Sequence, residues 1–204
     1  KARRLTTFPG AETPLFVSKD GVVYFSANIQ PDVNYDKFPG EPQVYTVNIK
    51  DGKSSLYTSI PMMNISANSN GIVLYEDYKG YEDALRKHHT SSVTRDIWSY
   101  VPPQGYAKGS VSAEGTFTKI SDYIGEDRNP VFASDGDTFY YLSERDGKTS
   151  NVYRSSLSDP KKRVQLTFEE KNPVRFLSVS AEGTLAYSCN GSLFVLKEGV
   201  KPSK

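Results

Sequence analysis

Four turns of the Asp-Gly type recur along the chain, each between two strand-like apolar runs. The turn dipeptides are Asp20-Gly21, Asn70-Gly71, Asp135-Gly136 and Glu182-Gly183. A run such as "PVFAS" precedes each turn, and a run such as "TFYYLS" follows it. Turns of this kind favour antiparallel hairpins, because glycine readily adopts the positive φ that they require. The sequence therefore predicts four related hairpins.

Two further strand-like runs accompany each hairpin. One run joins an aliphatic residue to an aromatic one, at Val44-Tyr45, Ile97-Trp98, Val152-Tyr153 and Leu193-Phe194. The other carries an aliphatic residue 15 to 17 positions before the turn glycine, namely Leu5, Leu56, Ile120 and Leu166. So constant an offset in four copies predicts a repeat of four short strands, A to D, with the Asp-Gly turn between A and B.

Repeated units of four antiparallel strands favour an all-β fold, a β-propeller in which each blade covers the faces of its neighbours. A β-sandwich is the alternative, although it does not require the pattern to recur in register. The order of the runs predicts a D strand in residues 1–7, repeats at 8–59, 60–122 and 123–168, and a partial repeat at 169–204.

Two closures fit this order of strands. Residues 2–7 either pair with 192–196 to close a four-bladed ring or belong to an open arc of a larger propeller. The absence of an initial Met favours the arc, and we therefore expect missing blades of a parent chain among the partners. Helix is expected to be limited to one or two turns near residues 82–88.

Composition excludes several classes of function. A formal net charge of +1 argues against a nucleic-acid partner. The chain contains no apolar run of 18 residues, so membrane insertion is not expected. The adjacent histidines His88 and His89 would point to opposite faces of a strand and chelate one metal poorly. No Gly-x-Ser-x-Gly elbow is present. We expect no cofactor, no metal and no catalytic residues in this chain.

The candidate binding residues lie in connections that the strand order places on one end of the blades. The basic group in 86–95 either lines the mouth of a channel or is a solvated loop paired with Glu82 and Asp83. Residues 127 and 128 either contact a peptide or bond to the neighbouring blade, and the arginine of "SERDG" either contacts a ligand or forms an ion pair between blades. The candidates are Arg86, Lys87, His88, His89, Arg95, Asp127, Arg128 and Arg145.

The segments "GYEDALRKHHTSSVTRDIW", "GEDRNPVFASDG" and "NPVRFLSVSAEGTLAYSCNG" resemble a known family. They are similar to the propeller of tricorn-like serine peptidases, of the secreted Bacteroidetes type, and more distantly to the propeller of TolB. The resemblance covers essentially the whole chain. It implies a parent serine peptidase in which PDZ and protease domains follow the propeller, and a periplasmic or secreted location.

The resemblance implies a non-catalytic module that guides or gates peptide substrates toward a separate protease domain. The alternative is a TolB-like scaffold for protein–protein interaction, without any protease domain. The sequence on either side of residues 1 and 204 would distinguish the two, since a peptidase domain after Lys204 favours the first.

Overall fold

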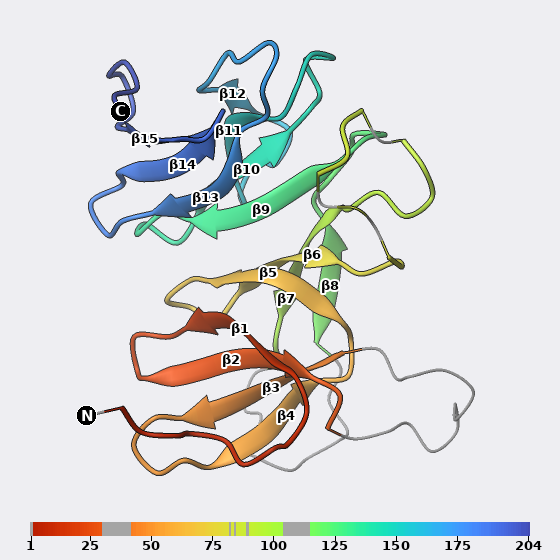
Figure 1. The fold of residues 1–204 in the computed structure, drawn as a ribbon, viewed down its shortest axis with the longest axis vertical. Helices are drawn as coiled ribbons and strands as arrows, with labels where there is room; N and C mark the ends of the chain where they lie inside the picture. Colours follow the sequence, from red (N-terminus) through yellow and green to blue (C-terminus); the bar gives the residue numbers. More distant parts are fainter. Residues whose placement is uncertain (1, 30–41, 82, 84, 89, 104–114) are drawn as a thin grey trace. The chain divides into compact units, whose positions relative to one another are not determined.

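The structure is a computed structural model that describes residues 2–29, 42–81, 83, 85–88, 90–103 and 115–204. The chain divides into two compact units, 1–63 and 64–204, and each is considered by itself. Every regular element in the described ranges is a β-strand, which confirms the all-β prediction (Figure 1). The described part of the chain contains no helix long and apolar enough to cross a membrane.

The first unit contains one four-stranded antiparallel sheet. Its strands are β1 (Glu12–Val17), β2 (Val22–Ala27), β3 (Gln43–Asn48) and β4 (Ser54–Thr58), paired in chain order. Phe25, Tyr45 and Val47 are buried on one face, where Leu5 and Phe8 pack against them. Val44 precedes Tyr45 on β3 and is also buried, so the sheet buries apolar side chains on both of its faces.

The second unit contains two four-stranded sheets and one three-stranded sheet, again paired in chain order. The first of these consists of β5 (Met62–Ala67), β6 (Val73–Asp77), β7 (Ile97–Val101) and β8 (Thr116–Lys119). The next consists of β9 (Asp127–Phe132), β10 (Thr138–Ser143), β11 (Asn151–Ser156) and β12 (Val164–Gln165). The last consists of β13 (Arg175–Val179), β14 (Leu185–Cys189) and β15 (Ser192–Leu196).

The four predicted A–B turns have the same backbone geometry. Gly21, Gly71, Gly136 and Gly183 have φ values of 77°, 79°, 77° and 78°. The amide of each glycine donates to the carbonyl three residues earlier, over 3.0 to 3.2 Å. A side chain at these positions would be strained, since L-residues rarely adopt this φ. The repeat in the sequence is therefore a repeat in the structure, and the sheets are propeller-type blades.

Apolar side chains pack the three sheets of the second unit face to face. Leu74 and Ile97 meet Phe139, Tyr141 and Tyr153 in one buried cluster. A second buried cluster joins the opposite face of the β9–β12 sheet to the last sheet: Tyr140, Leu142, Val152, Leu177, Leu185, Tyr187, Cys189 and Leu196. Alternate residues of β10 thus serve two different interfaces, as the two-residue period of a strand requires.

The prediction of a strand at residues 2–7 is wrong. This segment has no strand conformation, and side chains hold it in place. The Arg3 guanidinium donates to the Ile49 carbonyl, and the Thr6 hydroxyl donates to the Glu12 carboxylate over 2.6 Å.

The outer edge of β15 pairs at Val195 with Ser203, through backbone hydrogen bonds of 2.8 and 3.0 Å. Near the predicted helix, the described residues form a turn in which the Arg86 amide donates to the Asp83 carbonyl.

Candidate functional site

The candidate site lies in the second unit, where the β6–β7 and β10–β11 connections and the links leading into β9 and β13 emerge at the same end of their sheets. The longest of these connections is residues 78–96, and we call its residues 78–95 the strap. Residues 30–41, which connect β2 to β3 in the first unit, lie outside the described residues. His89 also lies outside them.

Arg95 anchors the base of the strap. Its side chain is buried, and its guanidinium donates to the carbonyls of Asp77 and Gly80, each over 3.0 Å. The guanidinium also lies over the Tyr78 ring, 5.1 Å from the centroid. Five donors in a fixed plane suit arginine to satisfying several carbonyls of a turn. The structure thus places Arg95 inside the base of the strap.

Hydrogen bonds from residues 85–88 of the strap reach the two following sheets. The His88 amide donates to Glu144 Oε2 over 2.6 Å, and His88 Nδ1 lies 3.8 Å from the same oxygen. Lys87 Nζ donates to the Lys171 carbonyl over 2.8 Å. Arg175 donates to the Leu85 carbonyl over 3.1 Å. These bonds join segments 56 to 90 residues apart in the sequence, so hydropathy patterns could not reveal them.

The outward side of the strap combines charged and apolar side chains. Arg86, Lys87 and His88 are exposed, as are Tyr81 and Leu85. Exposed apolar side chains are also present on the neighbouring links, at Ile124 and Phe168. Most of the basic group that the sequence singled out is thus displayed on this end of the unit.

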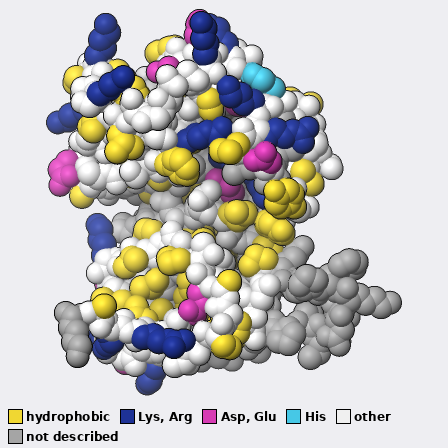
Figure 2. Space-filling model, viewed as in Figure 1, with side chains coloured by type: hydrophobic (Ala, Val, Ile, Leu, Met, Phe, Trp, Pro, Cys, Tyr) yellow, Lys and Arg dark blue, Asp and Glu magenta, His cyan; other side chains and the backbone are white. Residues whose placement is uncertain are grey.

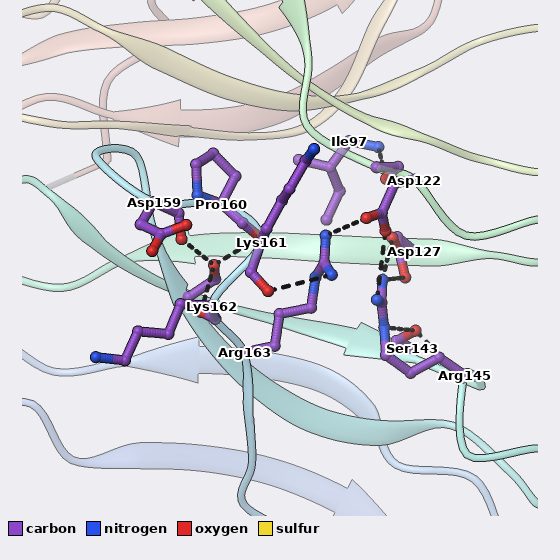
Figure 3. A network of polar contacts seen from close by, with 12 residues as sticks. Ile97, Asp122, Asp127, Ser143, Arg145, Asp159, Pro160, Lys161, Lys162 and Arg163 are labelled. Carbon is purple, nitrogen blue, oxygen red and sulfur yellow. Dashed lines mark hydrogen bonds and ion pairs between the residues drawn. The ribbon is translucent and has the colours of Figure 1, made fainter.

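Arg145 and Asp127 form the centre of a buried polar network (Figure 3). Asp127 is the first residue of β9, and Arg145 follows β10, its neighbour in the same sheet. Arg145 Nη2 lies 3.1 and 2.8 Å from the two carboxylate oxygens, while its Nε donates to the Ser143 hydroxyl. Burial raises the pKa of Asp127 above 3.8, and the charge of Arg145 and its hydrogen bonds oppose that shift.

Three tyrosine rings surround the Arg145 guanidinium. Its carbon lies 5.5 to 5.7 Å from the ring centroids of Tyr123, Tyr141 and Tyr153. Cation–π contact of this kind stabilises a guanidinium that has lost part of its hydration. Burial in turn raises the pKa of Tyr153 to about 12, so the ring stays neutral at physiological pH.

Asp122 links this network to the preceding repeat. Its carboxylate lies 3.4 Å from Arg145 Nη1 and 2.7 Å from Arg163 Nη2. An ion pair between blades was one of the two roles predicted for Arg145. The structure has that pair with Asp122, but the shorter and more buried pair, with Asp127, lies within one sheet.

Glu76, which the sequence did not single out, connects β5, β6 and β9. This fully buried carboxylate accepts hydrogen bonds of 2.6 Å from the Asn64 amide group and from the Asn129 backbone. Its other oxygen lies 4.0 Å from Arg128, which also pairs with Glu126 at 3.3 Å. A carboxylate inside the apolar run "IVLYE" was the available signal, because an acidic residue at a buried position needs partners.

Asn129 continues the connection to the last sheet. Its side chain donates to the Leu177 carbonyl and accepts from the Leu177 amide, each over 3.1 Å. Asn64 and Asn129 both adopt positive φ, 46° and 51°, which asparagine tolerates better than most residues. The Asp127 amide donates to the Arg95 carbonyl over 3.2 Å, which joins the start of β9 to the base of the strap.

The only cysteine is poorly placed for nucleophilic chemistry. Cys189 is buried, and its thiol lies 3.5 Å from the Asn172 carbonyl. Burial raises the pKa of this thiol above 9.0, which disfavours the reactive thiolate. No cluster of three or more potential metal ligands occurs in the described segments. The chemistry that this end of the unit supports is recognition through hydrogen bonds, charges and apolar contacts.

No protein-family model matches the sequence. No curated protein matches it either. Solved structures do resemble it. TolB from Acinetobacter baumannii superposes with a TM-score of 0.62 at 14% identity, over 94% of this chain and 42% of that one. A putative TolB from Agrobacterium tumefaciens gives a TM-score of 0.62 at 16% identity, over 92% of this chain and 62% of that one.

A peptidase structure resembles the chain to a similar degree. The puromycin-hydrolysing peptidase of Mycobacterium tuberculosis gives a TM-score of 0.59 at 10% identity, over 90% of this chain and 29% of that one. The chain therefore spans less than two thirds of each of these proteins. These likenesses establish the fold, a β-propeller of the type found in TolB and in peptidase propeller domains.

Proposed function

We propose that the chain is a non-catalytic propeller module of a tricorn-like peptidase, which guides or gates peptides toward a separate protease domain. The observation that carries this proposal is the strap. It is fixed to the two following sheets while its charged and apolar side chains face outward. A rigid scaffold that carries exposed loop residues is the usual arrangement of a binding surface.

Binding of peptides by the purified chain tests this proposal. The probe is a fluorescently labelled library of unstructured peptides, and the readout is anisotropy. Arg86→Ala and Tyr81→Ala each remove an exposed strap side chain without disturbing the bonds that fix the strap. We expect each to weaken binding about three- to tenfold, the range of ordinary interface contacts.

Lys161→Ala is the matched control, since Lys161 is an exposed cation in the β11–β12 connection, at the opposite end of the strands. It is expected to bind like the parent chain. Absence of binding, or equal loss in the Lys161 variant, would remove the strap as the recognition surface.

Hydrolysis of the same library tests the non-catalytic part of the proposal. Peptide hydrolysis needs a nucleophile, a base and donors to the developing oxyanion. We expect no turnover by the chain, and none by the His88→Ala and Cys189→Ala variants. Turnover that persists through repurification and disappears in His88→Ala would show that the chain is an enzyme.

The alternative is a TolB-like scaffold that binds folded proteins, which the likeness to two TolB structures favours. The two functions predict different partners. A scaffold would bind folded proteins through the same strap but show no affinity for the unstructured library. A peptidase domain encoded after residue 204 would favour the first function. For both we propose a periplasmic or secreted location, as the resemblance implies.

A further inference from the structure

The strap and the link into β13 bring together three cations that have no acidic partner among the described residues. Arg86 and Lys87 belong to the strap, and Lys171 belongs to the link. The Lys87 ammonium donates to the Lys171 carbonyl over 2.8 Å, which holds the two segments side by side. All three residues are exposed, and none forms an ion pair with another residue that the structure describes. Their positive charge is therefore not neutralised within this part of the chain.

Other cations at this end of the second unit do have carboxylate partners. They form the pairs Arg145–Asp127, Arg128–Glu126 and Lys148–Glu170. Asp83, the one acid among the described residues of the strap, accepts the Leu85 amide over 2.9 Å and so caps a turn. Glu144 is buried and accepts the His88 amide. The positive charge that is open to a ligand is thus concentrated on the strap and the link.

Exposed apolar side chains lie in the same two segments. Leu85, next to Arg86, is 66% exposed, and Phe168, three residues before Lys171, is 73% exposed. Lys and Arg side chains lie together with hydrophobic ones over the part of the second unit where Figure 1 draws the strap (Figure 2). We call this group the basic patch: Leu85, Arg86, Lys87, Phe168 and Lys171. Such a surface complements a ligand that combines negative charge with apolar groups.

We propose that the basic patch selects acidic peptides, in which Asp or Glu side chains alternate with apolar ones. This inference rests on the proposed function and adds the chemical class of the peptide. Peptide carboxylates pair with the three cations, through a planar fork at Arg86 and through point charges at the two lysines. The apolar side chains of the peptide contact Leu85 and Phe168. Because these ion pairs form in contact with water, salt should weaken them.

Three labelled peptides of equal length test this preference by fluorescence anisotropy. Glu and Leu alternate in the first peptide, and Gln or Lys replaces Glu in the other two. All are acetylated and amidated, so that only side chains carry charge. At about 50 mM NaCl we expect the Glu peptide to bind about tenfold more tightly than the Gln peptide, and at about 0.5 M NaCl the ratio should fall below about threefold.

Reversal of charge on the patch gives the sharpest test. The double variant Arg86→Glu, Lys171→Glu changes two exposed side chains that make no hydrogen bond to described residues, and it keeps the backbone carbonyl that accepts Lys87. We expect it to bind the Lys peptide more tightly than the Glu peptide, with an unchanged circular dichroism spectrum. The matched control is Lys161→Glu, Lys162→Glu, at the opposite end of the strands, which alters the net charge equally and should keep the preference for the Glu peptide.

The outcomes separate this inference from the function on which it rests. Equal affinity for the Glu and Gln peptides would overturn the acidic preference and leave peptide binding in place. A preference that the double variant keeps, or that the control loses to the same extent, would do the same. Equal binding of a Glu peptide with Ser in place of Leu would show that charge alone is recognised, which contradicts the role of Leu85 and Phe168. Absence of binding by every peptide would overturn both proposals.

Discussion

One terminal nitrogen of Arg145 holds both oxygens of Asp127, with Nη2 3.1 Å from Oδ1 and 2.8 Å from Oδ2. The carboxylate is almost completely buried, whereas the guanidinium side chain retains a small exposed fraction. An ionised carboxylate in such a place is tolerated only because it is paired and hydrogen-bonded. The pair therefore fixes the start of β9 to the end of β10.

Arg145→Ala is expected to lower the free energy of unfolding by about 3–5 kcal/mol, since it leaves a buried carboxylate without its partner. Arg145→Lys keeps the charge but lacks the planar fork, so an intermediate loss is expected. Urea unfolding followed by Trp98 fluorescence measures both. Lys148→Ala, which breaks the exposed pair with Glu170, is the control. A loss in Arg145→Ala no larger than in this control would contradict the assignment.

Asp127 and Asp122 are expected to affect stability in opposite directions as pH changes. Burial raises the pKa of Asp127, so the native state holds its proton more tightly than the unfolded chain does. The contribution of Asp127 is then fully present below the unfolded pKa and is lost as pH rises through the folded pKa. Burial alone would raise the pKa of Asp122 too, but Arg163 and Arg145 outweigh it and lower the pKa below 3.8. Its contribution is present above the unfolded pKa and is lost as pH falls.

Unfolding free energies measured between about pH 2 and pH 7 separate the two groups. The difference between the parent chain and Asp127→Asn should fall as pH rises, whereas the difference for Asp122→Asn should grow. Differences that change in the same direction would show that one of the two environments is misassigned.

Glu144 is expected to control the opening of the strap. Glu144→Ala removes the acceptor of the His88 amide, a hydrogen bond to a charged group. We expect trypsin to cleave after Arg86 and Lys87 about tenfold faster in this variant, because local opening precedes cleavage. Glu144→Gln keeps an acceptor oxygen and should be cleaved at nearly the parent rate. Mass spectrometry identifies the sites, and equal cleavage of all three chains would mean that this bond does not hold the strap.

Phe176 is expected to be a strained residue. It has φ 56°, where a bulky side chain is unfavourable, and with 76% exposure it gains little from packing. Phe176→Asn should therefore raise the free energy of unfolding by about 0.5–1 kcal/mol. Phe176→Ala removes the same ring without asparagine's tolerance of positive φ, and it should not stabilise. Both variants are compared with the parent chain by urea unfolding. Equal stabilisation by alanine would contradict the strain.

Most of the strand pattern could be predicted because its causes are local. The run "TFYYLS" and residues 192–196 become strands with the predicted bounds, and the four turn glycines share one backbone conformation. The candidate site was harder to predict. The sequence selected Arg86, Lys87 and His88 as charged loop residues, but it gave no means of finding Glu144, to which the strap is bonded. That contact joins residues 56 positions apart.

The amino-acid sequence by itself determined the repeat, the strand order within each sheet and the turns, since each depends on neighbours along the chain and on the two-residue period of a strand. The tertiary structure alone decided that residues 2–7 are held by side chains instead of a strand ladder, that Arg95 lies inside the strap, and that Leu193 is exposed. These outcomes depend on which surfaces meet. A hydrophobic residue such as Leu193 has the same local pattern as Val152, and only the presence or absence of a covering sheet makes one buried and the other exposed.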